Sequence, residues 1–244
     1  MTSLKSVLLA SALVIAAVAS SSAQTPPAPP GKPTRFQAGI GLLLGAPLGE
    51  FGNNVDNAAG VSVHLDVGLG GSVVSIGGEA AYLSYGGESR KVNLATAIPD
   101  LPGVVVTVNT DNAMVLVHGR VRAQPRRGRW RPYVDGVFGF TNIYTTTSIA
   151  ESGDCDAYSC TSGLEATNLE DFALSFGGGV GLMVGFGSSP WPARLDVSVR
   201  YLRGGEAEYL TEGGIRREGA QAFLDISRSP TNMVLVYIGI AIGR

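Results

Sequence analysis

Apolar residues alternate with small or polar residues through most of the chain. In AGVSVHLDVGLG (59–70), valine and leucine take every odd position from 61 to 69, while His64 and Asp66 share the even positions with glycine and serine. Successive side chains of a strand point to opposite faces, so this pattern predicts a strand with one apolar face. It recurs eight times, at about 35–46, 59–70, 73–86, 112–124, 132–146, 171–187, 193–204 and 231–243.

The connections between these segments alternate in length. Three are short turns, and the other four are longer. This alternation predicts an all-β fold, an eight-stranded antiparallel up-and-down barrel with both termini at the short-turn end. The short links are 70–72, 125–131 and 188–192, and the long ones are about 47–58, 87–111, 147–170 and 205–230.

The alternation alone does not say which face lies outside. A soluble lipocalin-like barrel hides its apolar face, whereas a membrane barrel exposes it. The polar face here consists of glycine and serine punctuated by charged residues, and the chain has only three lysines. Small residues suit a narrow interior, and each strand is long enough to cross a bilayer at a tilt. We therefore predict a transmembrane β-barrel with short periplasmic turns and long extracellular loops, with a soluble periplasmic binding barrel as the alternative.

Charged residues on the polar face then point into the lumen. An unpaired charge is costly in a dry interior, so these groups must pair or form hydrogen bonds. We predict a filled polar lumen held by a salt-bridge network of His64, Asp66, Glu79, His118, Arg120, Arg122, Asp135, Arg194, Asp196 and Arg200.

The N-terminal segment has the pattern of a secretory signal. Lys5 precedes an apolar run from Val7 to Ala19, and small residues follow up to Ala23. The run is too short to span a bilayer as a helix, which indicates a signal peptide over 1–23; a buried core helix is the alternative. Residues 24–33 carry five prolines and are expected to be a stiff linker, either a spacer or a cell-wall tether, before a barrel domain at 34–244.

Two cysteines, Cys155 and Cys160, lie in the motif CDAYSC. An exported chain meets an oxidising compartment, which favours a local disulfide. Half of a metal site is the alternative, but the chain has no other cysteine, and its two histidines fall in predicted strands. We expect no metal and no cofactor.

Three stretches carry a likeness to known proteins: RPYVDGVFGF (131–140), FALSFGGGVGLMVGFG (172–187) and MVLVYIGIAIGR (233–244). The chain from about 34 to 244 resembles the small Gram-negative outer-membrane β-barrels of the OmpA/OmpX type. Such barrels usually end in an aromatic residue, whereas Arg244 stands last here. The resemblance implies location in the outer membrane, contact with its lipid and lipopolysaccharide, and insertion by the outer-membrane assembly machinery.

Some barrels of this class modify lipids, and such chemistry needs a nucleophile with a base in reach. Ser62 and His64 share the inward face of one strand, about 7 Å apart along the backbone. They would point into a plugged lumen, so membership of the polar network is the favoured interpretation. We expect no enzymatic activity.

Two loops carry concentrated charge. The loop at 147–171 holds six carboxylates, which predicts a solvated acidic loop, with a bridging cation as the alternative. The turn PRRGRWR could contact lipid phosphates or anionic cell-wall groups, or serve only as an interfacial anchor. The acidic residues are Glu151, Asp154, Asp156, Glu165, Glu170 and Asp171, and the basic turn holds Arg126, Arg127, Arg129, Trp130 and Arg131.

The function expected from these features is structural or adhesive, exerted by a monomer through its extracellular loops. A narrow channel or a lipid-modifying enzyme is the alternative. The formal net charge of −2 gives no sign of nucleic-acid binding, and the sequence names no extracellular partner.

Overall fold

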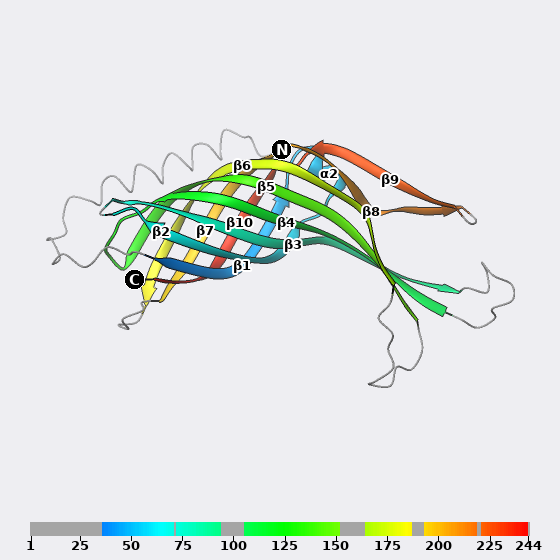
Figure 1. Cartoon of the computed structure of the whole chain (residues 1–244), viewed down its shortest axis with the longest axis horizontal. Helices are drawn as coiled ribbons and strands as arrows, with labels where there is room; N and C mark the ends of the chain where they lie inside the picture. The colour runs from blue at the N-terminus through cyan, green and yellow to red at the C-terminus, as the bar shows by residue number, and fades with distance from the viewer. Residues whose placement is uncertain are drawn as a thin grey trace. The chain divides into compact units, whose positions relative to one another are not determined.

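The computed structural model describes residues 36–70, 72–93, 105–151, 164–186, 193–218 and 221–243. They form a closed barrel and a separate two-stranded hairpin (Figure 1). The predicted eight-stranded antiparallel barrel is confirmed. Its strands are β1 (Gln37–Pro47), β2 (Ala58–Gly68), β3 (Val74–Asn93), β4 (Val105–Ala123), β5 (Trp130–Glu151), β6 (Leu164–Phe186), β7 (Ala193–Gly204) and β10 (Met233–Gly243).

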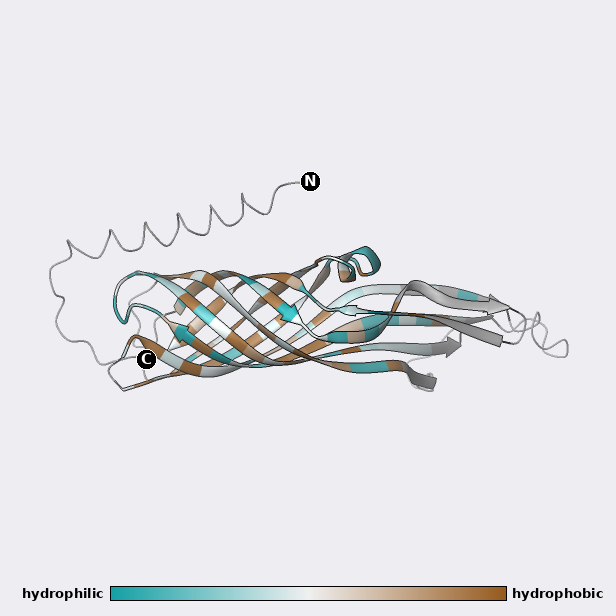
Figure 2. Ribbon diagram, turned by 90° about the horizontal axis from the view of Figure 1, so that it is seen from above, coloured by the Kyte–Doolittle hydropathy of each residue, from teal (hydrophilic) through white to brown (hydrophobic). Residues whose placement is uncertain are grey.

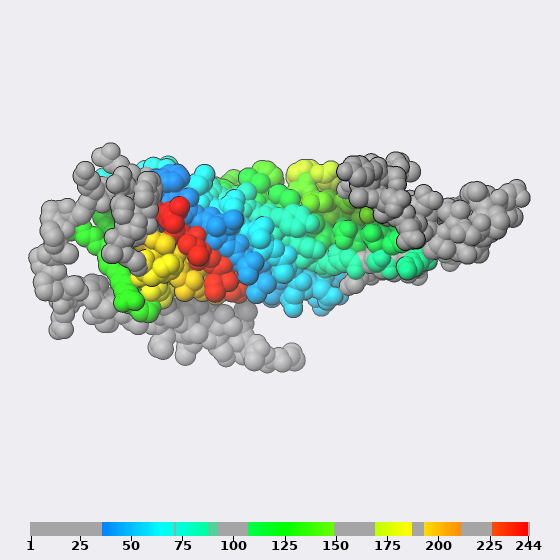
Figure 3. Space-filling view, turned by 90° about the horizontal axis from the view of Figure 1, so that it is seen from below, coloured from blue at the N-terminus to red at the C-terminus, as the bar shows by residue number. Residues whose placement is uncertain are grey.

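The first and last strands close the barrel. β1 pairs with β2 on one side and with β10 on the other, so that Gln37 lies opposite both Asp66 and Gly243. Figure 3 shows β10 in red between β1 in blue and β7 in yellow. Closure pairs the backbone groups of all eight strands, which a sheet surrounded by lipid requires.

The apolar faces of the strands lie on the outside of the barrel. Ile40 and Leu42 on β1 are 62% and 60% exposed, and Ile238 on β10 is 48% exposed. Figure 2 shows the resulting alternation of hydrophobic and hydrophilic positions along the barrel strands. A soluble barrel has the opposite arrangement, so the barrel is of the transmembrane type.

The strands β3 to β6 continue beyond the barrel, and this differs from the prediction. β3 pairs with β2 only up to Ser84 but with β4 up to Asn93, and β6 pairs with β7 only from Ser175 onward. Much of the predicted loops 87–111 and 147–170 is therefore strand. These extensions lack the apolar alternation because neither of their faces needs to meet lipid, so the period-two signal stops short of their ends.

Two further elements lie in the predicted long loops. α2 (Phe51–Asn54) is a single helical turn between β1 and β2. β8 (Glu206–Glu218) and β9 (Gln221–Pro230) form a hairpin within the long connection between β7 and β10.

Several predicted features lie outside the described residues. These are the signal peptide at 1–23, the linker at 24–33 and the disulfide between Cys155 and Cys160. In the part of the chain that the structure describes, no helix has the length and apolarity to cross a membrane.

Candidate functional site

The lumen of the barrel is the most strongly organised polar region that the structure describes. It contains all ten residues assigned to it from the sequence, each no more than 7% exposed. The barrel register sets their side chains on the inner faces of β2, β3, β4, β5 and β7. They are His64, Asp66, Glu79, His118, Arg120, Arg122, Asp135, Arg194, Asp196 and Arg200.

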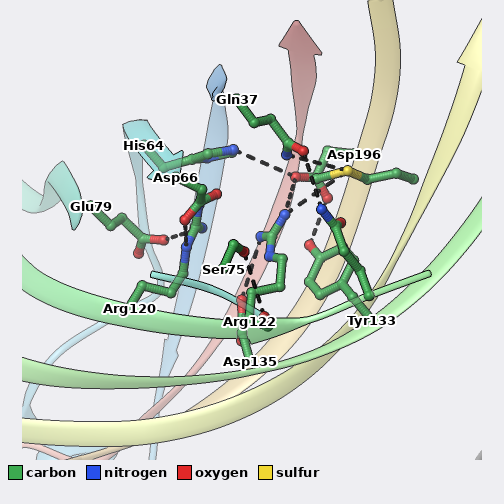
Figure 4. A network of polar contacts seen from close by, with 12 residues as sticks. Gln37, His64, Asp66, Ser75, Glu79, Arg120, Arg122, Tyr133, Asp135 and Asp196 are labelled. Carbon is green, nitrogen blue, oxygen red and sulfur yellow. Dashed lines mark hydrogen bonds and ion pairs between the residues drawn. The ribbon is translucent and has the colours of Figure 1, made fainter. Parts of the chain in front are cut away.

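Two arginines, Arg120 and Arg200, link three carboxylates across the lumen. Figure 4 shows Arg120 beside Asp66 and Glu79. Arg120 donates from Nε to Oδ1 of Asp66 at 3.1 Å and from Nη2 to Oδ2, and so holds both carboxylate oxygens. Its Nη1 donates to Glu79 at 3.1 Å. Arg200 donates to Glu79 at 2.7 Å and to Asp135 at 3.0 Å. Such charge-assisted, bidentate contacts are the strongest hydrogen bonds that side chains form.

A second group continues this network toward the short-turn end. Arg122 lies 3.5 Å from a carboxylate oxygen of both Asp135 and Asp196, and its guanidinium carbon lies 3.7 Å from the ring centroid of Tyr133. The Tyr133 hydroxyl donates to Asp196 at 2.6 Å. His64 Nε2 lies 3.8 Å from the same carboxylate. Each of the four lumenal carboxylates is thus held by at least one arginine.

The long-loop half of the lumen is filled mainly by apolar side chains, with a few buried polar ones such as Asn112 and Thr145, which differs from the predicted polar filling. Phe51 of α2 packs edge-on against Tyr209 of β8, with ring centroids 5.0 Å apart. We call the buried side chains that fill this half the apolar plug. Its members include Leu43, Phe51, Leu83, Tyr85, Met114, Leu116, Ile143, Leu202, Tyr209, Met233, Leu235 and Tyr237.

Little space remains between the polar network and the apolar plug. A cavity of about 10 Å³ is lined by residues of both, including His64, Leu235 and Tyr237. A cavity needs roughly 10–15 Å³ to hold a single water molecule. This cavity is therefore too small to hold a hydrated ion.

Two buried serines of the lumen, Ser62 and Ser175, carry the hydroxyl group that a nucleophile needs. Ser62 is buried, and its hydroxyl has no hydrogen-bond partner among the described residues, so it makes no hydrogen bond to His64. A different Ser–His pair does form, because His118 Nε2 lies 2.8 Å from Ser175 Oγ. Thr141 also donates to Ser175, which is fully buried. This pair is sealed inside the lumen.

The basic turn divides between the surface and the lumen. Trp130 is 62% exposed on the outer face, and Arg126 donates from Nε to the carbonyl of Ser72 at 2.8 Å. Arg131, which the sequence assigns to the basic turn, is only 7% exposed and its position is on the lumenal face of β5. Arg131 stands two positions before Tyr133, so the two side chains share one face of the strand. This spacing is the sequence signal for the placement.

The acidic stretch 147–171 is only partly described. The carboxylate of Asp171 accepts hydrogen bonds from the backbone of Phe172 and of Glu208, both at 2.8 Å, and so fixes the start of β8. Glu170 accepts a hydrogen bond from Asn142 at 2.7 Å. Asp154 and Asp156 lie outside the described residues. Within the described ranges, no group of His, Cys, Asp and Glu is arranged to hold a metal ion.

Inward glycines make the contacts between distant side chains possible. His118 lies opposite Gly139, which lies opposite Ser175, so the two side chains meet across a strand that has none between them. Gly77 likewise separates Asp66 from Arg120. The sequence shows glycines on the inner face, but only the register shows which side chains they bring together.

Comparison with known proteins gives no family assignment. No family model and no curated protein matches the chain. Among solved structures, Neisserial surface protein A shares 6% identity at a TM-score of 0.42, covering 87% of this chain and 99% of that one. A Pseudomonas aeruginosa FadL homologue shares 11% identity at a TM-score of 0.24, covering 86% and 75%.

Proposed function

We propose that this chain is an integral outer-membrane β-barrel with a closed lumen and a structural or adhesive role. The observation that carries the proposal is that charged residues lie inside the barrel and apolar residues outside, the reverse of a soluble protein. Five arginines and four carboxylates are buried inside, while Ile40, Leu42 and many similar side chains face outward. That arrangement is stable only where the outer surface meets hydrocarbon.

The closed lumen supports a role other than transport. The polar network joins β2, β3, β4, β5 and β7, and the apolar plug fills the region beyond it. A channel would require several of these contacts to open together. A narrow channel is therefore the weaker alternative.

The surfaces left for interaction are those beyond the barrel. The extended parts of β3 to β6 and the hairpin β8–β9 lie beyond the paired barrel strands, at the end away from the short turns. Small barrels of the OmpA/OmpX type share the barrel architecture and the long loops. By this likeness we assign the extension to the cell exterior and to contact with an extracellular partner.

A lipid-modifying activity has less support than a structural role. The contact between His118 and Ser175 has a suitable pair of residues, but Ser175 is fully buried among lumenal side chains. A lipid on the outer face of the barrel cannot reach it without opening the wall. Unchanged membrane lipids on mass spectrometry after His118→Ala would agree with the structural role, and altered lipids would contradict it.

The first test is fractionation with gel mobility. We expect the protein in the outer membrane, resistant to a urea wash, with a faster band before boiling than after it. In planar bilayers we expect no discrete conductance steps. A periplasmic protein that washes out and shows no heat shift would contradict the membrane proposal, whereas stable conductance steps would contradict only the closed lumen.

A further inference from the structure

Three polar side chains with unmet hydrogen bonds border the small cavity between the polar network and the apolar plug. They are His64, Arg122 and Tyr237, each no more than 7% exposed. Nε2 of His64, Nε of Arg122 and the hydroxyl of Tyr237 are buried and have no hydrogen-bond partner among the described residues. A buried polar atom is costly unless something bonds to it, so this cavity favours a molecule that can do so.

Two glycines allow the rings of His64 and Tyr237 to lie at this cavity. A Cβ atom at Gly39 would overlap the imidazole of His64, and one at Gly239 would overlap the hydroxyl of Tyr237. The two rings lie edge to face, with their centroids 5.7 Å apart and their planes at 62°. A larger residue at either glycine position would displace one of the rings, so the glycines fix where the two polar atoms lie.

The cavity matches a single water molecule in size and in hydrogen bonding. Its volume is about 10 Å³, close to the space that one water needs, and a buried water makes about three hydrogen bonds. Nε of Arg122 can only donate, whereas a tyrosine hydroxyl donates or accepts, and Nε2 of a neutral histidine does either according to its tautomer. Because water both donates and accepts, it can satisfy all three atoms.

The charges around the cavity disfavour an ion. Glu79 lines the cavity, and a carboxylate oxygen of Asp196 lies 3.8 Å from Nε2 of His64, so an anion would be repelled. Arg120 and Arg200 also line the cavity and would repel a cation. A neutral molecule is subject to neither repulsion.

We propose that this cavity is a binding site for one neutral water molecule, which accepts a hydrogen bond from Nε of Arg122 and bridges His64 to Tyr237. Arg122 belongs to the polar network and Tyr237 to the apolar plug, so this water joins the two halves of the lumen. The site follows from the packing of the lumen and is independent of the role proposed above.

The test is a crystal structure of the folded protein in detergent, at a resolution that shows ordered water. We expect one density peak within hydrogen-bond distance of Nε2 of His64, Nε of Arg122 and the hydroxyl of Tyr237, and no anomalous peak there after a bromide soak. The density peak should be lost in Tyr237→Phe, which removes one of the three partners and adds no atom to the cavity. Tyr85→Phe is the matched control and should keep the peak, because Tyr85 is a buried tyrosine of the plug that does not line the cavity.

The contrary outcomes are equally specific. A wild-type structure with ordered water elsewhere in the protein but none in the cavity would overturn the site. An undiminished peak in Tyr237→Phe, or equal loss of the peak in Tyr85→Phe, would overturn the bridge to Tyr237. A bromide peak in the cavity would overturn the assignment to neutral water. If Tyr237→Phe does not fold, the wild-type density and the bromide soak still decide the proposal.

Discussion

At the scale of single residues, the bond between Arg120 and Asp66 should dominate the stability of the polar network. Arg120 holds both oxygens of this carboxylate, whereas Glu79 keeps Arg200 as a second partner. Arg120→Met leaves Asp66 buried without its main partner, and we expect a loss of about 3–5 kcal/mol in the free energy of unfolding. Urea titration in lipid vesicles, followed by the heat-shifted gel band, measures it.

The second half of this test restores the balance of charge. Because Asp66→Leu removes the stranded carboxylate, the double variant with Arg120→Met should be more stable than Arg120→Met alone. If the double variant instead loses as much stability as the two single variants combined, Asp66 does not depend on Arg120 in this way.

A glycine on the inner face shows how tightly the lumen is packed. An added Cβ at Gly181 would lie 2.2 Å from the ring of Tyr133, whose hydroxyl holds Asp196. We expect Gly181→Ala to destabilise the barrel by about 1–3 kcal/mol in the same titration. Gly119→Ala is the control, since its nearest neighbour is 3.6 Å away on the exposed face; an equal loss there would assign the effect to strand glycine in general.

The sequence predicted which residues face the lumen but not which of them meet. Period-two alternation assigns Asp66 and Arg120 to the inner face, yet the two are 54 positions apart and separated by β3. Their contact follows from the strand register and from Gly77 between them, and neither can be derived from one strand alone. The burial of Arg131 was not predicted, because its basic neighbours indicated only that it belongs to the turn.

At the scale of elements, the hairpin β8–β9 closes the long-loop end through Tyr209. This side chain packs on Phe51, and its hydroxyl contacts Asn54 and Ser229. We expect Tyr209→Ala to speed amide hydrogen exchange of α2 and of the hairpin at least tenfold, because a buried aromatic contributes several kcal/mol to local packing. The midpoint of global unfolding should move much less, since the barrel strands keep their pairing.

The Tyr209→Phe variant distinguishes the contribution of the aromatic ring from that of the hydroxyl group. It keeps the contact with Phe51 and removes the bonds to Asn54 and Ser229, so we expect an intermediate exchange rate. Exchange in α2 that is unchanged by Tyr209→Ala would show that the hairpin does not hold α2 in place.

The elements differ in how well the sequence predicted them. The membrane-crossing parts of the strands have one face against lipid and one against the lumen, so apolar alternation identifies them closely. The extensions of β3 to β6 continue past the closed barrel, and among the described residues of β8 it is Ala207 and Tyr209 that join the apolar plug. Their pairing is set by backbone bonds, which leave no periodic signal in the sequence.

At the scale of the whole molecule, the apolar exterior decides the environment of the protein. Ile238 lies near the middle of the outer face of β10 and is 48% exposed. Arginine at such a position costs about 2–4 kcal/mol in lipid but less than about 0.5 kcal/mol on a water-exposed surface. Ile238→Arg should therefore lower the free energy of unfolding in vesicles, whereas Ser89→Arg, on the exposed extension of β3, should not. Equal and small effects of both substitutions would show that the apolar face does not meet lipid and would favour a soluble binding barrel.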